Sequence, residues 1–165
     1  LELEPDNVEA IVALSVLDYN KGTAACVRQG TERLTKAFAA NSKHPRVLNY
    51  LANHFFYKGE YGHVQTMAEI ALSSTEVAKM NGESCFHLAR NYQAQGDYDS
   101  AFEYYSKAIQ HWPSFPLAQF GLAQMCVHKG NAAKAIKLLQ HVLKHYPYNY
   151  EATKMLASLY VGTSN

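Results

Sequence analysis

The side chains in this sequence that most readily do chemistry are eight histidines and three cysteines. His141 and His145 are four residues apart, so on a helix both rings would reach one metal ion. No third ligand is evident near them, and the sequence has no His-Glu-x-x-His pattern. We therefore interpret them as surface histidines and predict no metal site.

A catalytic site is not indicated either. The other histidines considered for acid–base work are scattered over separate predicted helices, and no signature groups a nucleophile, a base and an orienting residue. Walker and Gly-x-Gly-x-x-Gly phosphate loops are absent. We predict a non-enzymatic chain without a cofactor. These scattered histidines are His54, His63, His87, His111 and His128.

The cysteines are odd in number and widely spaced, which fits a reducing compartment, nuclear or cytosolic, better than a disulfide framework. Cys85 and Cys126 fall on apolar stripes, so we expect buried structural thiols. Cys26 is expected in a segment between two helices.

Charge and hydropathy exclude two further classes of function. The formal net charge is +1, so the chain as a whole carries no electrostatic footprint for nucleic acid. No run of about 18 apolar residues exists that would span a bilayer. We predict no membrane association and no direct nucleic-acid binding.

The elements that would position any site repeat along the chain. The segment 85–92 aligns with 119–126, an offset of 34 residues, and in the same frame Gly96 falls on Gly130 and Pro113 on Pro147. Related segments begin at Leu48 and Met155, and a weaker one begins at Ile11. A period of this length indicates a repeat array.

This pattern resembles the tetratricopeptide repeat, in which small residues let two amphipathic helices approach closely. The resemblance implies an all-α, right-handed superhelical solenoid of antiparallel helix pairs. We expect a tail of a preceding repeat at 1–6, repeats at 7–44, 45–81, 82–115 and 116–149, and the first helix of a fifth at 150–165. The expected helices are 7–20, 24–40, 45–57, 60–77, 80–94, 98–111, 114–128, 131–145 and 149–162.

Two places depart from the pattern. About three extra residues fall within Lys21–Gln29, and about three more fall within Glu76–Asn81. Repeat two also lacks the closing proline, with Glu76 near its place. We expect the solenoid to bend there or a helix to run long. Leu1–Glu4 is expected to be the remnant of an upstream helix, and the array is expected to continue beyond both ends.

A partner would bind where the first helices of successive repeats line the inner face. Amides there suit a peptide backbone, and aromatic rings can anchor apolar side chains. The alternative is a solvated face, with the partner bound elsewhere. The candidate contacts are Asn49, Tyr50, Asn53, Tyr57, Phe86, His87, Arg90, Phe120, Gln124, His128 and Lys154.

One known use of such grooves is disfavoured. Repeat proteins that dock chaperone tails resemble one another in a basic clamp for a terminal carboxylate. Here Asn49 stands where the clamp lysine would be and His87 replaces an asparagine. The later cations are replaced by Leu117 and Gly121. A carboxylate would therefore lose most of its charge-assisted bonds.

The stretches 47–56, 64–65, 75–77, 83–90 and 120–125 carry a more specific likeness. Together they resemble the family of repeat-rich scaffold subunits of the RNA polymerase II-associated factor (PAF) complex, and the chain is expected to be an internal segment. The resemblance implies a nuclear, non-enzymatic scaffold that holds the other subunits and meets the RNA polymerase II elongation machinery, directly or indirectly. It also implies a part in transcription elongation and co-transcriptional histone modification.

A generic peptide-docking adaptor, such as a chaperone or transport co-factor, is the alternative function. An enzyme or its regulatory arm is a third possibility, but no catalytic constellation supports it.

Overall fold

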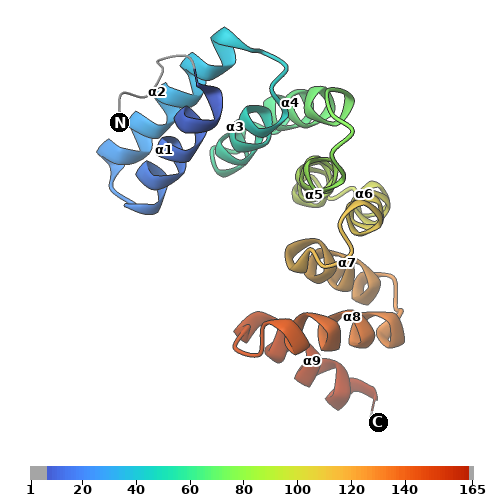
Figure 1. The fold of residues 1–165 in the computed structure, drawn as a ribbon. Helices are drawn as coiled ribbons and strands as arrows, with labels where there is room; N and C mark the ends of the chain where they lie inside the picture. Colours follow the sequence, from blue (N-terminus) through green and yellow to red (C-terminus); the bar gives the residue numbers. More distant parts are fainter. Residues whose placement is uncertain (1–6, 164–165) are drawn as a thin grey trace. The chain divides into compact units, whose positions relative to one another are not determined.

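The computed structural model describes residues 7–163. Within that range the chain forms nine helices and no strand (Figure 1), and the helices are joined by short connections. The expected tail at 1–6 and helix remnant Leu1–Glu4 lie outside the described residues. The helices are α1 (Val8–Asn20), α2 (Ala24–Ala40), α3 (Pro45–Tyr57), α4 (Tyr61–Ser73), α5 (Ala78–Ala94), α6 (Tyr98–His111), α7 (Pro116–His128), α8 (Ala132–His145) and α9 (Tyr150–Thr163).

The predicted helix bounds are confirmed to within two residues except around α4. That helix ends at Ser73 and not at residue 77, and α5 begins at 78 and not at 80. The hydroxyls of Ser73 and Ser74 donate back to the carbonyl of Ile70, and the Thr75 hydroxyl accepts from the backbone N–H of Val77 at 3.1 Å. Such local bonds compete with the helical ladder, so α4 stops without a proline.

Both sets of inserted residues lengthen helices. Only Lys21–Thr23 separate α1 from α2, and α2 has 17 residues where α4 has 13. Likewise α5 has 17 residues where α3 and α7 have 13. Cys26 consequently lies in the first turn of α2, so its expected place between two helices was wrong. Its backbone N–H is capped by the Thr23 hydroxyl at 3.2 Å.

The chain divides into two compact units, one ending at His87 and one beginning at Leu88. In the first unit α1 packs against α2 and α3 against α4. Its main core cluster joins α1, α2 and α3, because apolar side chains three and four residues apart turn to one side of each helix. The buried members are Val12, Leu34, Ala37, Val47 and Leu51.

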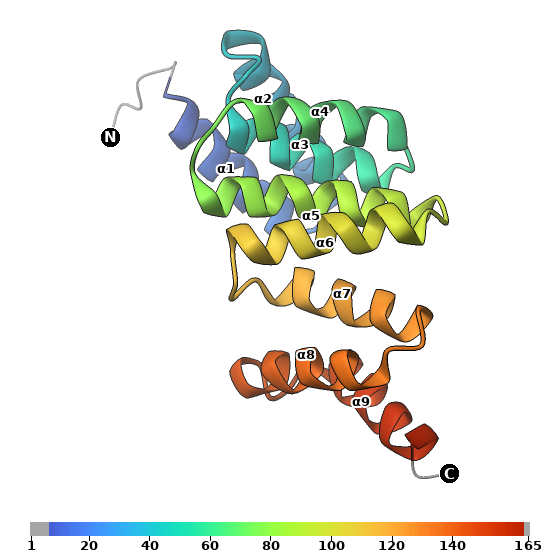
Figure 2. The ribbon, with the colours of Figure 1, turned by 90° about the vertical axis from the view of Figure 1, so that its right-hand side faces the viewer.

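In the second unit α6 packs against α7, α7 against α8, and α8 against α9. Figure 2 shows α6, α7 and α8 running side by side in alternating directions. The connections are tight because glycine ends the first helix of each pair. Gly96 has a φ of +82° and Gly130 a φ of +74°, the left-handed conformation that ends helices and that only glycine adopts without strain.

The second helix of every pair buries three residues at one spacing: i, i+4 and i+7. These residues lie on one line along the helix, and alanine predominates among them, so the axes approach closely. The predicted close contact at Ala101 and Ala108 is confirmed. The four triplets are Gly30, Leu34 and Ala37; Val64, Ala68 and Ala71; Ala101, Tyr105 and Ala108; and Ala135, Leu139 and Val142.

Tyr105 is the bulky member of its triplet, and it needs room on α7. Its side chain is 3% exposed, and its ring lies over Gly121. A Cβ atom built at Gly121 would overlap three carbon atoms of that ring. The glycine is therefore a packing requirement of the α6–α7 contact.

We expect Gly121→Ala to lower the free energy of unfolding by about 1–3 kcal/mol, the usual cost of overpacking a tight contact. The measurement is urea unfolding followed by circular dichroism at 222 nm. Tyr105→Leu should restore part of the loss in the Gly121→Ala background, because the clashing ring is gone.

Gly62→Ala is the matched control, since a Cβ atom at this position in α4 meets nothing within 4 Å. It should raise the free energy of unfolding by up to about 1 kcal/mol through helix propensity. Equal effects of the two substitutions would contradict the packing explanation.

Candidate protein-interaction surfaces

Asn49 on α3 is buried and ties this helix to the start of α5. Its side chain is 3% exposed, and its Nδ2 donates to the carbonyl of Met80 at 3.2 Å. Its Oδ1 accepts from the Ser84 hydroxyl at 2.8 Å. The amide thus supplies both a donor and an acceptor to another helix. Because Asn49 is buried and bonded to α5, a partner could not touch its side chain.

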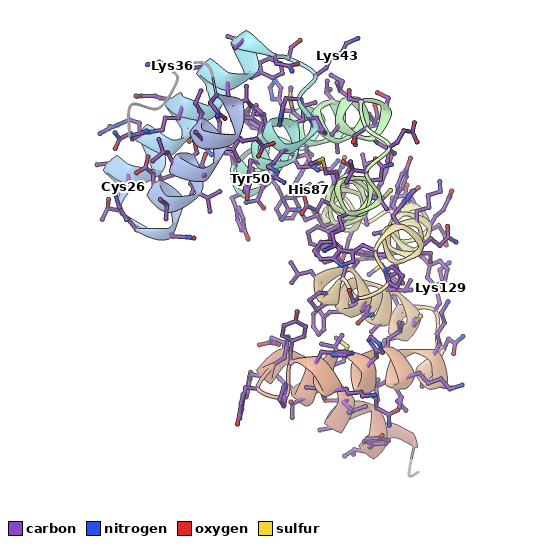
Figure 3. The ribbon with its side chains drawn as sticks, in the orientation of Figure 1. Cys26, Lys36, Lys43, Tyr50, His87 and Lys129 are labelled. Carbon is purple, nitrogen blue, oxygen red and sulfur yellow. The ribbon has the colours of Figure 1, made fainter. Side chains whose placement is uncertain are left out.

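Tyr50, labelled in Figure 3, is the next residue of α3 and is half-buried, with the charges of Glu83, Arg46 and Glu9 near it. Burial raises the pKa of its hydroxyl, and the nearby Glu83 carboxylate adds to the shift. Arg46 lies on the same face and pairs with Glu9 of α1 at 2.7 Å. The tyrosine hydroxyl therefore stays protonated at neutral pH, beside carboxylates that a basic partner would meet.

Glu83 on α5 lies within reach of the Asn49 amide, its Oε2 being 3.5 Å from Nδ2. Burial raises the pKa of this carboxyl, while Arg46 and the Asn49 amide oppose the shift. Glu83 is not among the contacts predicted from the sequence. The sequence could have indicated it, because Glu83 lies one turn before the predicted contact Phe86 on the same helix face.

The remaining candidates of the first unit differ in exposure. Tyr57 is 79% exposed at the end of α3, Asn53 and Phe86 are half-buried, and His87 is only 7% exposed. The Phe86 and His87 rings lie 5.6 Å apart. Since Glu83 contacts α3, Phe86 three residues later shares the face of α5 that is turned to α3. We call Tyr50, Asn53, Tyr57 and Phe86 the α3 surface.

In the second unit a chain of polar side chains joins three helices. The Tyr105 hydroxyl of α6 donates to Oε1 of Gln93 at 2.7 Å, and Nε2 of Gln93 donates to Oε1 of Gln124 at 3.2 Å. Burial strongly raises the pKa of Tyr105, and the nearby Arg90 only partly offsets this, so the hydroxyl remains a donor. Gln124 thus belongs both to the helix contact and to the half-exposed face of α7.

Arg90, Phe120 and Gln124 form what we call the α7 surface. Arg90 lies three residues before Gln93 on α5, and Phe120 four residues before Gln124 on α7, so each pair shares a helix face. All three side chains are half-buried.

The last two candidates differ in how they relate to the α7 surface. His128 is four residues after Gln124 and so lies on the same side of α7, at the end of the helix. The ring of His128 at the end of α7 meets the edge of Tyr98 on α6 at 4.0 Å between centroids. Lys154 is exposed on α9. Neither is included in the α7 surface, because the His128 ring is engaged by Tyr98 and Lys154 belongs to another helix.

The candidate surfaces show no cluster of side chains that would form a metal site within the described residues. Within residues 7–163 no three histidine, cysteine, aspartate or glutamate side chains cluster as metal ligands would. Cys85 and Cys126 are 1% and 0% exposed, which confirms the predicted buried thiols, and burial raises the pKa of Cys126. What the surfaces offer is aromatic rings, amides and charges, the groups that recognise another protein.

None of the helices in the described part of the chain is both apolar enough and long enough to cross a membrane.

Comparison with known proteins places the fold. The family model described as "Tetratricopeptide repeat" matches residues 92–159. One similar solved structure is the APC/C hetero-tetramer Cut9–Hcn1, with a TM-score of 0.79 at 18% identity, covering 93% of this chain and 30% of that one. The chain is an all-α tetratricopeptide-repeat solenoid, as the sequence predicted.

Comparison with curated sequences identifies more specific relatives than the fold comparison does. The chain is 37% identical over 164 residues to the "Protein CTR9 homolog" of Arabidopsis thaliana, and the match covers 97% of this chain and 15% of that protein. It is 32% identical over 161 residues to the "RNA polymerase-associated protein CTR9" of Caenorhabditis elegans, covering 97% and 14%. The predicted likeness to polymerase-associated scaffold subunits is confirmed, and the chain spans about 15% of the length of these relatives.

We expect Asn49→Ala to lower the free energy of unfolding by about 1–3 kcal/mol, because the bonds of its amide to Ser84 and Met80 are lost and the Ser84 hydroxyl keeps only its bond to the Met80 carbonyl. Tyr57→Ala, at an exposed position of the same helix, should change it by no more than about 0.5 kcal/mol. Urea unfolding of both variants measures the difference. If Asn49→Ala were as harmless as Tyr57→Ala, the amide would not hold α3 to α5.

The raised pKa of Glu83 predicts a pH dependence of stability. Its ordinary value is 4.5, and a carboxyl that binds its proton more tightly in the folded state stabilises the fold below that pH. This contribution is lost as the pH rises through the folded pKa. Glu83→Gln keeps the polar shape and removes the ionisation.

We therefore expect the unfolding free energy of Glu83→Gln, relative to wild type, to increase from pH 4 to pH 7. Urea unfolding at a series of pH values measures it. Glu69→Gln, at an exposed position of α4, is the control and should show no such trend. A flat difference for Glu83→Gln would show that burial does not penalise its charge.

Proposed function

We propose that this chain is a non-enzymatic protein–protein interaction segment of the repeat-rich scaffold subunit of the PAF complex. The observation that carries the proposal is the 37% identity to a CTR9 homologue over 97% of the chain. The scaffold would act in the nucleus, in RNA polymerase II transcription elongation and co-transcriptional histone modification. Its partners would be the other subunits of that complex and the elongation machinery, directly or indirectly.

The two surfaces defined above suit this role. Tyr57 and the half-buried Tyr50 offer rings with polar tips, and such residues dominate binding energy when a partner covers them. The Asn53 and Gln124 amides can each donate to and accept from an extended backbone. Phe86 and Phe120 are partly exposed rings on which an apolar side chain of the partner could pack. We propose the α3 surface and the α7 surface as partner contacts.

Docking of a chaperone tail is the alternative that the side chains disfavour. Asn49 is 3% exposed and already bonded to α5, so it could not replace the clamp lysine. Leu117 is 56% exposed but apolar, and Gly121 has no side chain. A terminal carboxylate would find no cation at these three places.

The test is recovery of partners from nuclear extract by the immobilised chain. We expect polymerase-associated subunits to be recovered. Asn53→Ala/Tyr57→Ala on the α3 surface or Arg90→Ala/Gln124→Ala on the α7 surface should reduce that recovery at least about fivefold, since a contact worth 1–2 kcal/mol changes binding by this factor or more. Tyr148→Ala is the matched control, because its ring is 98% exposed in another segment.

Circular dichroism must show that each variant remains folded. Recovery of chaperones in place of polymerase-associated subunits would overturn the proposed function. Unchanged recovery with both double variants would instead remove the two surfaces from the proposal and leave the scaffold role to other faces of the chain.

A further inference from the structure

A second surface of the first unit is a groove between the exposed side of α2 and the end of α3. The groove has a volume of about 650 Å³. Its α2 wall comprises residues spaced three and four apart from Ala24 to Lys36, so most of one face of α2 lines the groove. Figure 3 labels Cys26 and Lys36 toward the two ends of this helix. The lining includes Val27, Arg28, Glu32, Lys36, His54 and Lys58.

The groove carries more positive than negative charge, because three cations and one carboxylate line it. Arg28, Lys36 and Lys58 are exposed, and within residues 7–163 none of the three forms an ion pair. Glu32 is the single carboxylate among the lining residues. The cation on the other side of α2 is paired: Arg33 lies 3.0 Å from Asp18, on the side of α2 turned to α1. The inner cation of α2 is therefore paired with a carboxylate, whereas the two cations that it turns to the groove form no ion pair within the described residues.

The floor of the groove is less polar than its rim. Val27 is half-buried there, and the Thr31 hydroxyl is already engaged, donating to the carbonyl of Val27 at 2.9 Å and lying 3.0 Å from the Tyr19 hydroxyl. His54 packs beside them, its ring centroid 6.4 Å from that of Tyr19. Burial and the neighbouring Lys58 lower the pKa of His54, so its ring is neutral at pH 7. The groove thus has a mainly apolar floor, with no net charge, under a cationic rim.

We propose that this groove binds an acidic amphipathic helix of a partner protein. The apolar side of such a helix would cover Val27 and its neighbours, and its carboxylates would meet Arg28, Lys36 and Lys58. Arg28 and Lys36 are eight residues apart on α2, roughly 12 Å along the axis, which a partner helix lying alongside can match with carboxylates about two turns apart. A helix laid by its apolar face into a groove is a common mode of recognition.

Charge complementarity selects an acidic protein segment over nucleic acid. Three cations interrupted by Glu32 are few beside the six to ten phosphate contacts of a typical nucleic-acid interface. The half-buried apolar floor has no counterpart in a phosphate backbone. An acidic helix satisfies the rim and the floor together.

This inference rests on the proposed function only in that the chain binds other proteins. It adds a surface on the second helix of a repeat, apart from the α3 and α7 surfaces. The experiment uses a synthetic helix. If the helix does not bind, the recovery of polymerase-associated subunits is still an independent test of the proposed function. If those subunits are not recovered, binding of the helix to the groove can still be measured.

The probe is a stapled helical peptide of about 18 residues, roughly 27 Å long, with leucines on one face and glutamates flanking them. Its matched control carries glutamine for glutamate. Fluorescence anisotropy with the 165-residue chain measures Kd. We expect the glutamate peptide to bind at least about tenfold more tightly than the glutamine peptide, and the difference to shrink as salt is raised from about 50 to 300 mM.

Arg28→Glu/Lys36→Glu/Lys58→Glu should weaken binding of the glutamate peptide at least about tenfold. The matched variant Lys43→Glu/Lys137→Glu/Lys144→Glu reverses three other exposed lysines and should leave Kd within about twofold. Circular dichroism verifies folding. Should the triple reversal unfold, the milder Arg28→Gln/Lys36→Gln should still weaken binding about threefold.

Equal affinity for the two peptides, or an unchanged Kd after charge reversal, would overturn the proposal. So would tighter binding of a single-stranded RNA of similar length with the same dependence on Arg28, Lys36 and Lys58, because the groove would then be a nucleic-acid site.

Discussion

The structure depends on close approach of helix axes along one line of each second helix. That line comprises a buried triplet, as in Ala101, Tyr105 and Ala108. Small residues bring two backbones together, and a large one such as Tyr105 is tolerated only where the facing helix gives up a side chain, as α7 does at Gly121. Once this contact is fixed, each helix has a determined inner and outer face, and every surface discussed above follows from that orientation.

The 34-residue period was enough to predict most of the fold. It gave the helix-pair architecture and most boundaries, because glycine and proline mark the helix ends and small residues mark the contacts. It could not say where the inserted residues would go, since a loop and an extra helical turn are equally compatible with the pattern. The end of α4 was likewise misplaced, because the bonds of Ser73, Ser74 and Thr75 to nearby backbone are invisible to hydrophobic periodicity.

The surfaces were harder to predict than the fold, because the exposure of a polar side chain depends on its individual hydrogen bonds. Helical periodicity places Asn49 and Tyr57 on α3, but it cannot tell that the Asn49 amide bonds to Ser84 and Met80 while Tyr57 is 79% exposed. His128 is similar, because its ring turns to Tyr98. Polar side chains near a helix contact have several partners to choose from, and the choice depends on neighbours distant in sequence. The groove between α2 and α3 was not predicted, because the repeat pattern marks the apolar residues that pack the helices and not the charged residues on the exposed side of α2.

The longer helices α2 and α5 show how a repeat array can change without losing its frame. An α-helix turns once in about 3.6 residues, so inserting three or four at its amino end returns every later side chain to nearly its former direction. The triplet of α2 is still buried, and the added turn simply projects about 5–6 Å further. Insertions of one turn are therefore nearly neutral for folding, while they enlarge the outside of the protein. Ala24, on the first turn of α2, is part of the groove wall. An array of this kind can acquire new recognition surface in steps of one helical turn, independently of the contacts that keep it folded.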